Sequence, residues 1–77
     1  MNATYQEEEN MLCVDAGSKM DLEEIGEFVH FMLLFVNPKS IDVRQNVEEN
    51  NRTRVYLELD KKQAETLRDK LQLNCEI

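Results

Sequence analysis

Residues 25–36 are the most nonpolar stretch of the chain, and their nonpolar side chains fall on more than one side of the helix that their length predicts. A surface helix in a small domain needs only one nonpolar stripe. At about 100° per residue, the arc that would pack on a sheet holds Leu22, Ile25, Val29, Met32, Leu33 and Val36. Phe31 and Leu34 point away from that arc, and Phe28 and Phe35 lie on its flank. These four residues therefore predict an interaction surface, because a soluble domain rarely leaves such a patch uncovered.

The segment before this helix predicts a strand and a turn. Residues 11–14 form a short nonpolar run that ends at Asp15-Ala16-Gly17-Ser18. Ser18 fits the N-cap position of the helix. Asn37-Pro38 ends the helix near Val36, because the residue before a proline is pushed out of the helical region.

The second half of the chain predicts a hairpin followed by a helix. Residues 40–47 alternate between nonpolar and polar side chains, and residues 54–59 do the same, so each segment predicts a half-buried strand. The segment 48–52 between them holds adjacent asparagines, which tolerate the left-handed backbone of a hairpin turn. Asp60 then caps a helix whose single nonpolar stripe consists of Ala64, Leu67 and Leu71.

Residues 73–77 alternate again and predict a short last strand. The order strand, helix, strand, strand, helix, strand is the split β-α-β-β-α-β arrangement of α+β ferredoxin-like domains, with a four-stranded antiparallel sheet and two helices on one face. This single domain spans residues 11–77, and the polar, acidic residues 1–10 predict a flexible tail. The first and last strands are neighbours in this fold, which would bring Cys13 close to Cys75, as two small buried side chains or as a redox pair.

Net charge divides the chain into two unequal parts. The total is −7, and residues 1–36 carry eight acidic side chains and one basic side chain, whereas residues 37–77 carry eight of each. Nucleic-acid binding needs clustered Lys and Arg against phosphate, so this composition argues against direct nucleic-acid binding. The acidic half instead favours a protein partner with a basic surface, unless the charge serves only solubility.

No pattern in the chain predicts catalysis, a metal site or a cofactor. His30 has no Cys, Ser or Asp at helical spacing to form a relay, and two glycines are too few for a phosphate-binding loop. Two cysteines and one histidine do not match a zinc motif. No run reaches membrane-spanning length, and the N-terminal residues lack the pattern of a signal peptide. The sequence therefore predicts a cytoplasmic protein, in the host cytoplasm if it is viral, with no membrane attachment.

The layout of residues 11–77 resembles the ACT domains, which are regulatory ferredoxin-like modules. The residues that carry the resemblance are Val14-Asp15-Ala16-Gly17-Ser18 leading into Leu22, Ile25 and Val29, then Asn37-Pro38-Lys39-Ser40-Ile41, and the helix from Ala64 to Leu71. Ala16 departs from the pattern, since many members have proline there. The resemblance implies that the domains pair and bind an amino acid near Asp15, Gly17 and Ser18. Without a ligand, these three residues are a turn and a cap.

Three occupants could cover the predicted surface of Phe28, Phe31, Leu34 and Phe35. A second copy would make a homodimer, which is the commonest way for a small domain to hide such a patch. A different protein could cover it, and so could the N-terminal tail through Tyr5 or Met11. We therefore expect a small, acidic, non-enzymatic interaction protein that binds or inhibits another macromolecule through its first helix, as a homodimer. The alternative is an ACT-like module that senses an amino acid.

Overall fold

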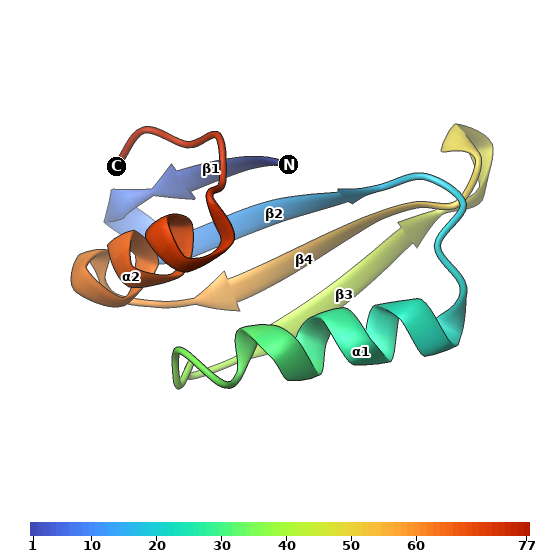
Figure 1. Ribbon diagram of the computed structural model, residues 1–77. Coiled ribbons are helices and arrows are strands. Elements are labelled where there is room, and N and C mark those ends of the chain that lie inside the picture. Colours follow the sequence, from blue (N-terminus) through green and yellow to red (C-terminus); the bar gives the residue numbers. More distant parts are fainter.

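The computed structural model describes residues 1–77 and shows one antiparallel sheet of four strands with two helices (Figure 1). Along the chain the elements are β1 (Asn2–Gln6), β2 (Met11–Gly17), α1 (Leu22–Met32), β3 (Ile41–Asn46), β4 (Arg52–Glu58) and α2 (Lys61–Leu71). The strands are ordered β1-β2-β4-β3, so β2 and β4 are central and β1 and β3 are the edges. This arrangement confirms the predicted fold class, because it is consistent with an α+β ferredoxin-like fold.

The first ten residues form a strand and a turn, which corrects the prediction of a flexible tail. β1 pairs with β2 along its whole length, with Thr4 opposite Cys13 and Tyr5 opposite Leu12. Its polar composition is misleading because an edge strand needs to bury only one of its two sides. On β1 that side consists of Ala3 and Tyr5, which are half-buried and pack against the core.

The element order is consequently β-β-α-β-β-α, and β1 occupies the edge position that the sequence assigned to residues 73–77. Those last residues form no strand, which corrects the second prediction. Asn74 makes a single parallel bridge with Asn2. Its amide donates a hydrogen bond of 2.8 Å to the Met1 carbonyl, and its carbonyl accepts one of 3.2 Å from the Ala3 amide. The C-terminal segment therefore lies along the outer edge of β1 (Figure 1).

The two halves of the chain repeat one pattern of strand, 3-10 helix, strand and α-helix. The 3-10 helices, Glu7–Glu9 and Val47–Glu49, each join the strands of a hairpin, and each ends at an asparagine. Asn10 and Asn50 adopt left-handed backbone with φ of 52° and 57°, which asparagine tolerates better than most residues. Because β2 and β4 pair antiparallel at the centre of the sheet, an approximate two-fold axis between them relates the halves.

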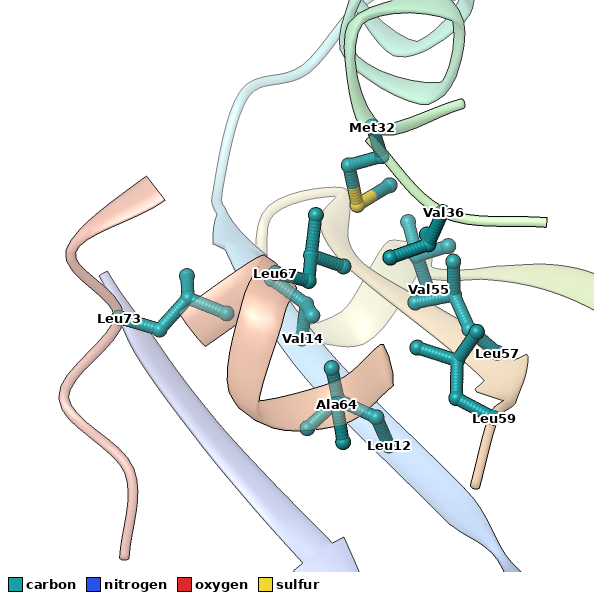
Figure 2. Packing of buried hydrophobic residues seen from close by; sticks show 10 residues of the cluster. All are labelled: Leu12, Val14, Met32, Val36, Val55, Leu57, Leu59, Ala64, Leu67 and Leu73. Carbon is teal, nitrogen blue, oxygen red and sulfur yellow. The ribbon is translucent and has the colours of Figure 1, made fainter. Parts of the chain in front are cut away.

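Both helical segments pack on the same face of the sheet, above alternate side chains of the central strands. Burial of each large nonpolar side chain is worth about 1.5 to 3 kcal/mol, so this face provides most of the stability. Its core consists of Leu12, Val14, Met32, Val36, Val55, Leu57, Leu59, Ala64, Leu67 and Leu73 (Figure 2).

Both ends of α1 differ from the prediction. The N-cap is Asp21 and not Ser18: the Asp21 carboxylate accepts a hydrogen bond of 2.8 Å from the Glu24 amide, and the Glu24 carboxylate accepts one from the Asp21 amide. This reciprocal capping box outcompetes Ser18 because it satisfies two free amides at once. The helix ends at Met32 and not near Val36, since the amides of residues 34 and 35 donate to carbonyls three residues back in a tighter turn.

The second helix begins as the sequence predicts. The Asp60 carboxylate accepts a hydrogen bond of 2.8 Å from the Gln63 amide, which makes Asp60 the N-cap of α2. The hairpin turn before it also contains left-handed residues at Asn50 and Asn51, as predicted. Local signals therefore set the geometry of this half of the chain.

Candidate interaction site

The C-terminal end of α1 and the turn that follows it present large nonpolar side chains to solvent. Phe31 is 44% exposed and Leu34 is 65% exposed. Phe28 and Phe35 are half-buried and pack against the core, so they form the inner margin of the same patch. These four predicted interface residues are termed the α1 apolar surface below. Phe31 and Leu34 form its open part, where a partner could gain contact area.

An aromatic contact and a lysine fix the position of Phe35. Its ring meets the Phe31 ring edge to face, with centroids 5.2 Å apart and an interplanar angle of 84°. The Lys70 ammonium group of α2 lies 5.9 Å from the centroid of the Phe35 ring. This flank of α1 therefore faces α2, and the Phe31 ring is held by its neighbour while one side of it stays open.

The opposite flank of α1 corrects part of the predicted core stripe. Ile25, Met32 and Val36 are buried as predicted, but Leu22 is 83% exposed and Leu33 is 44% exposed. The reason is the position of α1 at the β3 side of the sheet (Figure 1). Because β3 is the last strand, the outer flank of α1 has no further strand to pack on.

Acidic side chains lie beside the α1 apolar surface. Glu24 and Glu27 are exposed and precede Phe28 and Phe31 by four residues, which places each carboxylate one turn away from an aromatic ring on the same flank. The charge of Glu24, which lies in the first turn, also complements the positive end of the helix dipole. A partner that covers Phe31 would therefore meet carboxylates at the rim of the contact.

Asp15 and Gly17, the residues that the ACT resemblance implies for ligand binding, lie together at the end of β2. Both Asp15 carboxylate oxygens accept hydrogen bonds from the Arg52 guanidinium, at 2.9 and 3.0 Å, and the Gly17 amide donates to one of them at 2.9 Å. Gly17 has a φ of 96°, at a bulge that glycine accommodates readily. Ser18 is exposed beside them. These residues, Ser18 excepted, line a surface pocket of about 330 Å³ together with Met1, Asn2, Ala16 and Arg52.

The Asp15 carboxylate is thus already neutralised by Arg52 inside the chain. An amino-acid ligand would have to displace this ion pair or bind around it, and the ligand-binding role stays a prediction. The sequence did not indicate Arg52 as a member of this group, because the pairing joins strands that are distant along the chain.

The two cysteines lie on opposite sides of the sheet and are both free. Cys13 alternates with the buried Leu12 and Val14, so it faces the uncovered side, where its pairing partner on β4 is Tyr56. Cys75 packs against the core on the helix side, and burial raises the pKa of its thiol. The predicted proximity is wrong because residues 73–77 do not form the strand that was to carry Cys75.

The face of the sheet opposite the helices carries charged side chains that are already paired. Arg44 donates to the Asp42 carboxylate at 2.8 Å, and Arg54 donates to Glu49 at 3.0 Å. The guanidinium carbon of Arg44 also lies 4.9 Å from the centroid of the Tyr56 ring. These contacts leave no concentration of free positive charge on that face.

Sequence reasoning assigned the sheet edge beside β2 to the wrong segment, since it placed β1 outside the domain and residues 73–77 inside the sheet. One signal could have found β1. Glu8-Glu9-Asn10 matches Glu48-Glu49-Asn50, so the turn predicted for the second hairpin occurs once before, between β1 and β2.

The described chain contains no group of three or more His, Cys, Asp or Glu side chains placed to hold a metal ion. None of its helices has the length and nonpolar character needed to cross a bilayer. Compared with protein-family models, curated proteins and solved structures, the chain matches none of them.

Proposed function

We propose that this protein is a non-enzymatic interaction protein that works as a homodimer and binds, and thereby inhibits or modulates, another protein through the α1 apolar surface. The observation that carries the proposal is the exposure of Phe31 and Leu34 at one end of α1, at 44% and 65%. Large nonpolar side chains that gather in this way on a small domain mark contact sites.

The energetic gain from covering this surface is sufficient to guide binding. Full burial of Phe31 and Leu34 is worth about 1.5 to 3 kcal/mol for each side chain. Their exposed fractions mean that roughly half of that gain is still available to a partner. The Phe31 ring is held by Phe35, so little side-chain freedom is lost when a partner covers it.

The partner is proposed to be a protein with a basic surface around a nonpolar pocket. Glu24 and Glu27 lie one turn from Phe28 and Phe31, and the first half of the chain carries the net negative charge. Charges at the rim of an interface mainly accelerate association, and salt screens them over about 10 Å at 0.1 M. Binding should therefore weaken as salt is raised, while the nonpolar contact itself persists.

An affinity pull-down from an extract of the native host, followed by mass spectrometry, tests the proposal. The baits are the wild-type protein, the double variant Phe31→Glu/Leu34→Glu, and the control Thr4→Glu/Thr66→Glu. The control adds the same charge at exposed positions on β1 and α2. Circular dichroism confirms that each bait is folded.

We expect wild type and control to retain the same partner and the Phe31→Glu/Leu34→Glu variant to lose it. Purified partner should then bind this variant with an affinity reduced by about tenfold or more, which corresponds to about 1.4 kcal/mol. Retention of the same proteins by all three baits, or retention of nothing by any of them, would contradict the proposal.

A further inference from the structure

The two edges of the sheet differ in one respect: the chain covers one and leaves the other open. At the β1 edge, Asn74 exchanges hydrogen bonds with Met1 and Ala3, and Leu73 is buried next to it. At the β3 edge, Ile41–Asn46 pair with β4 on one side, and no strand lies along their other, outer side. An uncovered edge strand offers a row of free amides and carbonyls to another strand.

The residues of β3 that offer these groups can be identified from the pairing with β4. The Glu58 amide donates to the Ser40 carbonyl, so residues 40 and 58 mark a hydrogen-bonded position. Such positions recur at every second residue of an antiparallel pair. Asp42 and Arg44 therefore use their backbone groups on β4, whereas Ile41, Val43 and Gln45 direct theirs outward.

Two opposite charges flank Val43 at equal distances along β3. Asp42 precedes it and Arg44 follows it, and both side chains lie on the face opposite the helices. Within one chain the Arg44 guanidinium already donates to the Asp42 carboxylate at 2.8 Å. In an antiparallel pair of two β3 strands centred on Val43, Asp42 of each copy would also lie directly opposite Arg44 of the other, which extends these two ion pairs across the interface. Opposite charges at such positions stabilise a register, and like charges oppose it.

We propose that the β3 edge binds a second copy of this chain, in an antiparallel β3–β3 pair with Val43 on the two-fold axis. Ile41 and Gln45 of one copy pair with Gln45 and Ile41 of the other, which makes about six backbone hydrogen bonds. The two sheets become one continuous sheet of eight strands. A second copy is the proposed partner because it would place Arg44 opposite Asp42 and Asp42 opposite Arg44.

The outer flank of α1 supports the same interface, which is called the β3 seam below. Leu22 and Leu33 are exposed on this flank, and Val43 on β3 is 38% exposed. The axis through Val43 brings the two α1 helices to the same side of the joined sheet, with these outer flanks toward each other. Nonpolar contact there adds to a strand pairing that is too small to form a stable interface alone.

This inference rests on the proposed function for the existence of the homodimer, but it places the seam at β3 and leaves Phe31 and Leu34 free for a partner. Partner binding through the α1 apolar surface and dimerisation through β3 can therefore fail separately. Loss of the partner in Phe31→Glu/Leu34→Glu with the dimer retained supports both proposals. A dimer that dissociates in this variant and persists in β3 variants overturns the β3 seam.

The first test is sedimentation velocity of wild type and Val43→Pro over a range of protein concentrations. Proline lacks the amide that Val43 would donate across the seam, yet a free monomer loses no hydrogen bond because this amide faces outward. We expect a concentration-dependent dimer for wild type and a folded monomer for Val43→Pro. A wild-type protein that stays monomeric at every concentration, or a Val43→Pro dimer of unchanged affinity, overturns the proposal.

The second test is a charge exchange, which decides the matter if Val43→Pro fails to fold. Asp42→Arg and Arg44→Asp each place like charges opposite each other twice in the dimer, and we expect each to raise the dissociation constant by about tenfold or more. The double variant Asp42→Arg/Arg44→Asp restores opposite charges at both places and should restore dimerisation. Single variants that dimerise like wild type, or a double variant that does not recover, overturn the register.

Discussion

Tyr5 provides the most direct test of the difference between a flexible tail and a structured first strand. Its side chain is half-buried against the core, and its hydroxyl donates a hydrogen bond of 3.0 Å to the Leu59 carbonyl at the end of β4. Burial is also the main reason why the pKa of Tyr5 is raised. We predict that Tyr5→Ala destabilises the protein strongly, whereas Thr4→Ala, at the exposed neighbouring position, does not.

The expected size follows from these contacts. Truncation of a fully buried aromatic side chain to alanine costs about 3 to 5 kcal/mol, so a half-buried ring should cost roughly half of that. Loss of the hydrogen bond to Leu59 adds about 1 kcal/mol. The sum is about 2.5 to 3.5 kcal/mol, which in a domain of this size lowers Tm by about 10 to 28 °C. Thr4→Ala should change stability by no more than about 0.5 kcal/mol.

The assay is urea unfolding followed by circular dichroism, because the chain has no tryptophan for fluorescence. Protein concentration is kept constant so that self-association does not change the apparent stability. Tyr5→Phe keeps the ring and removes only the hydroxyl, so we expect it to lose about 1 kcal/mol. If Tyr5→Ala unfolds at the same urea concentration as Thr4→Ala, β1 is not docked on β2 and the reasoning is refuted.

Two further predictions concern single groups. Asp60→Ala removes the cap of α2 and should cost about 0.5 to 2 kcal/mol in urea unfolding, whereas Asp60→Asn keeps an acceptor and should cost much less; equal losses in both would disprove the capping role. In Cys13→Ser protein, the pH midpoint of Cys75 alkylation should be higher when the protein is folded than in urea, because burial raises the pKa of this thiol. The native state holds the proton more tightly, so the linked stability is present below the unfolded pKa and is lost as pH rises through the folded pKa. Equal midpoints would contradict this shift.

The sequence by itself determined the elements whose signals are local. The alternation in residues 40–47 and 54–59, the asparagines between them and the Asp60 cap all depend on neighbours a few residues away. The two strands and the cap are found in the structure, at β3, β4 and the start of α2, but β3 ends at Asn46 and, unlike the predicted half-buried strand, buries only part of Ile41. The excess of nonpolar side chains on α1 was equally readable, because helical spacing alone separates Phe31 from the buried Met32.

Only the tertiary structure decided which segments complete the sheet. The sequence predicted residues 1–10 as a flexible tail and residues 73–77, which alternate, as the strand beside β2. β1 takes the edge because its turn places it directly against β2 and because Tyr5 reaches the Leu59 carbonyl. Strand pairing joins backbone groups that any residue carries, so side-chain pattern says little about which strand pairs with which.

Because side-chain pattern does not tell which strands pair, it also revealed only part of the candidate sites. Helix geometry located the α1 apolar surface from residue spacing, but the Asp15–Arg52 pair and the free edge of β3 depend on strand order across the sheet. A wheel drawn from the sequence also placed Leu22 and Leu33 in the core, because it contains no information about where the sheet ends. Local periodicity determined which side chains share a face, and non-local pairing of the backbone decided what each face meets.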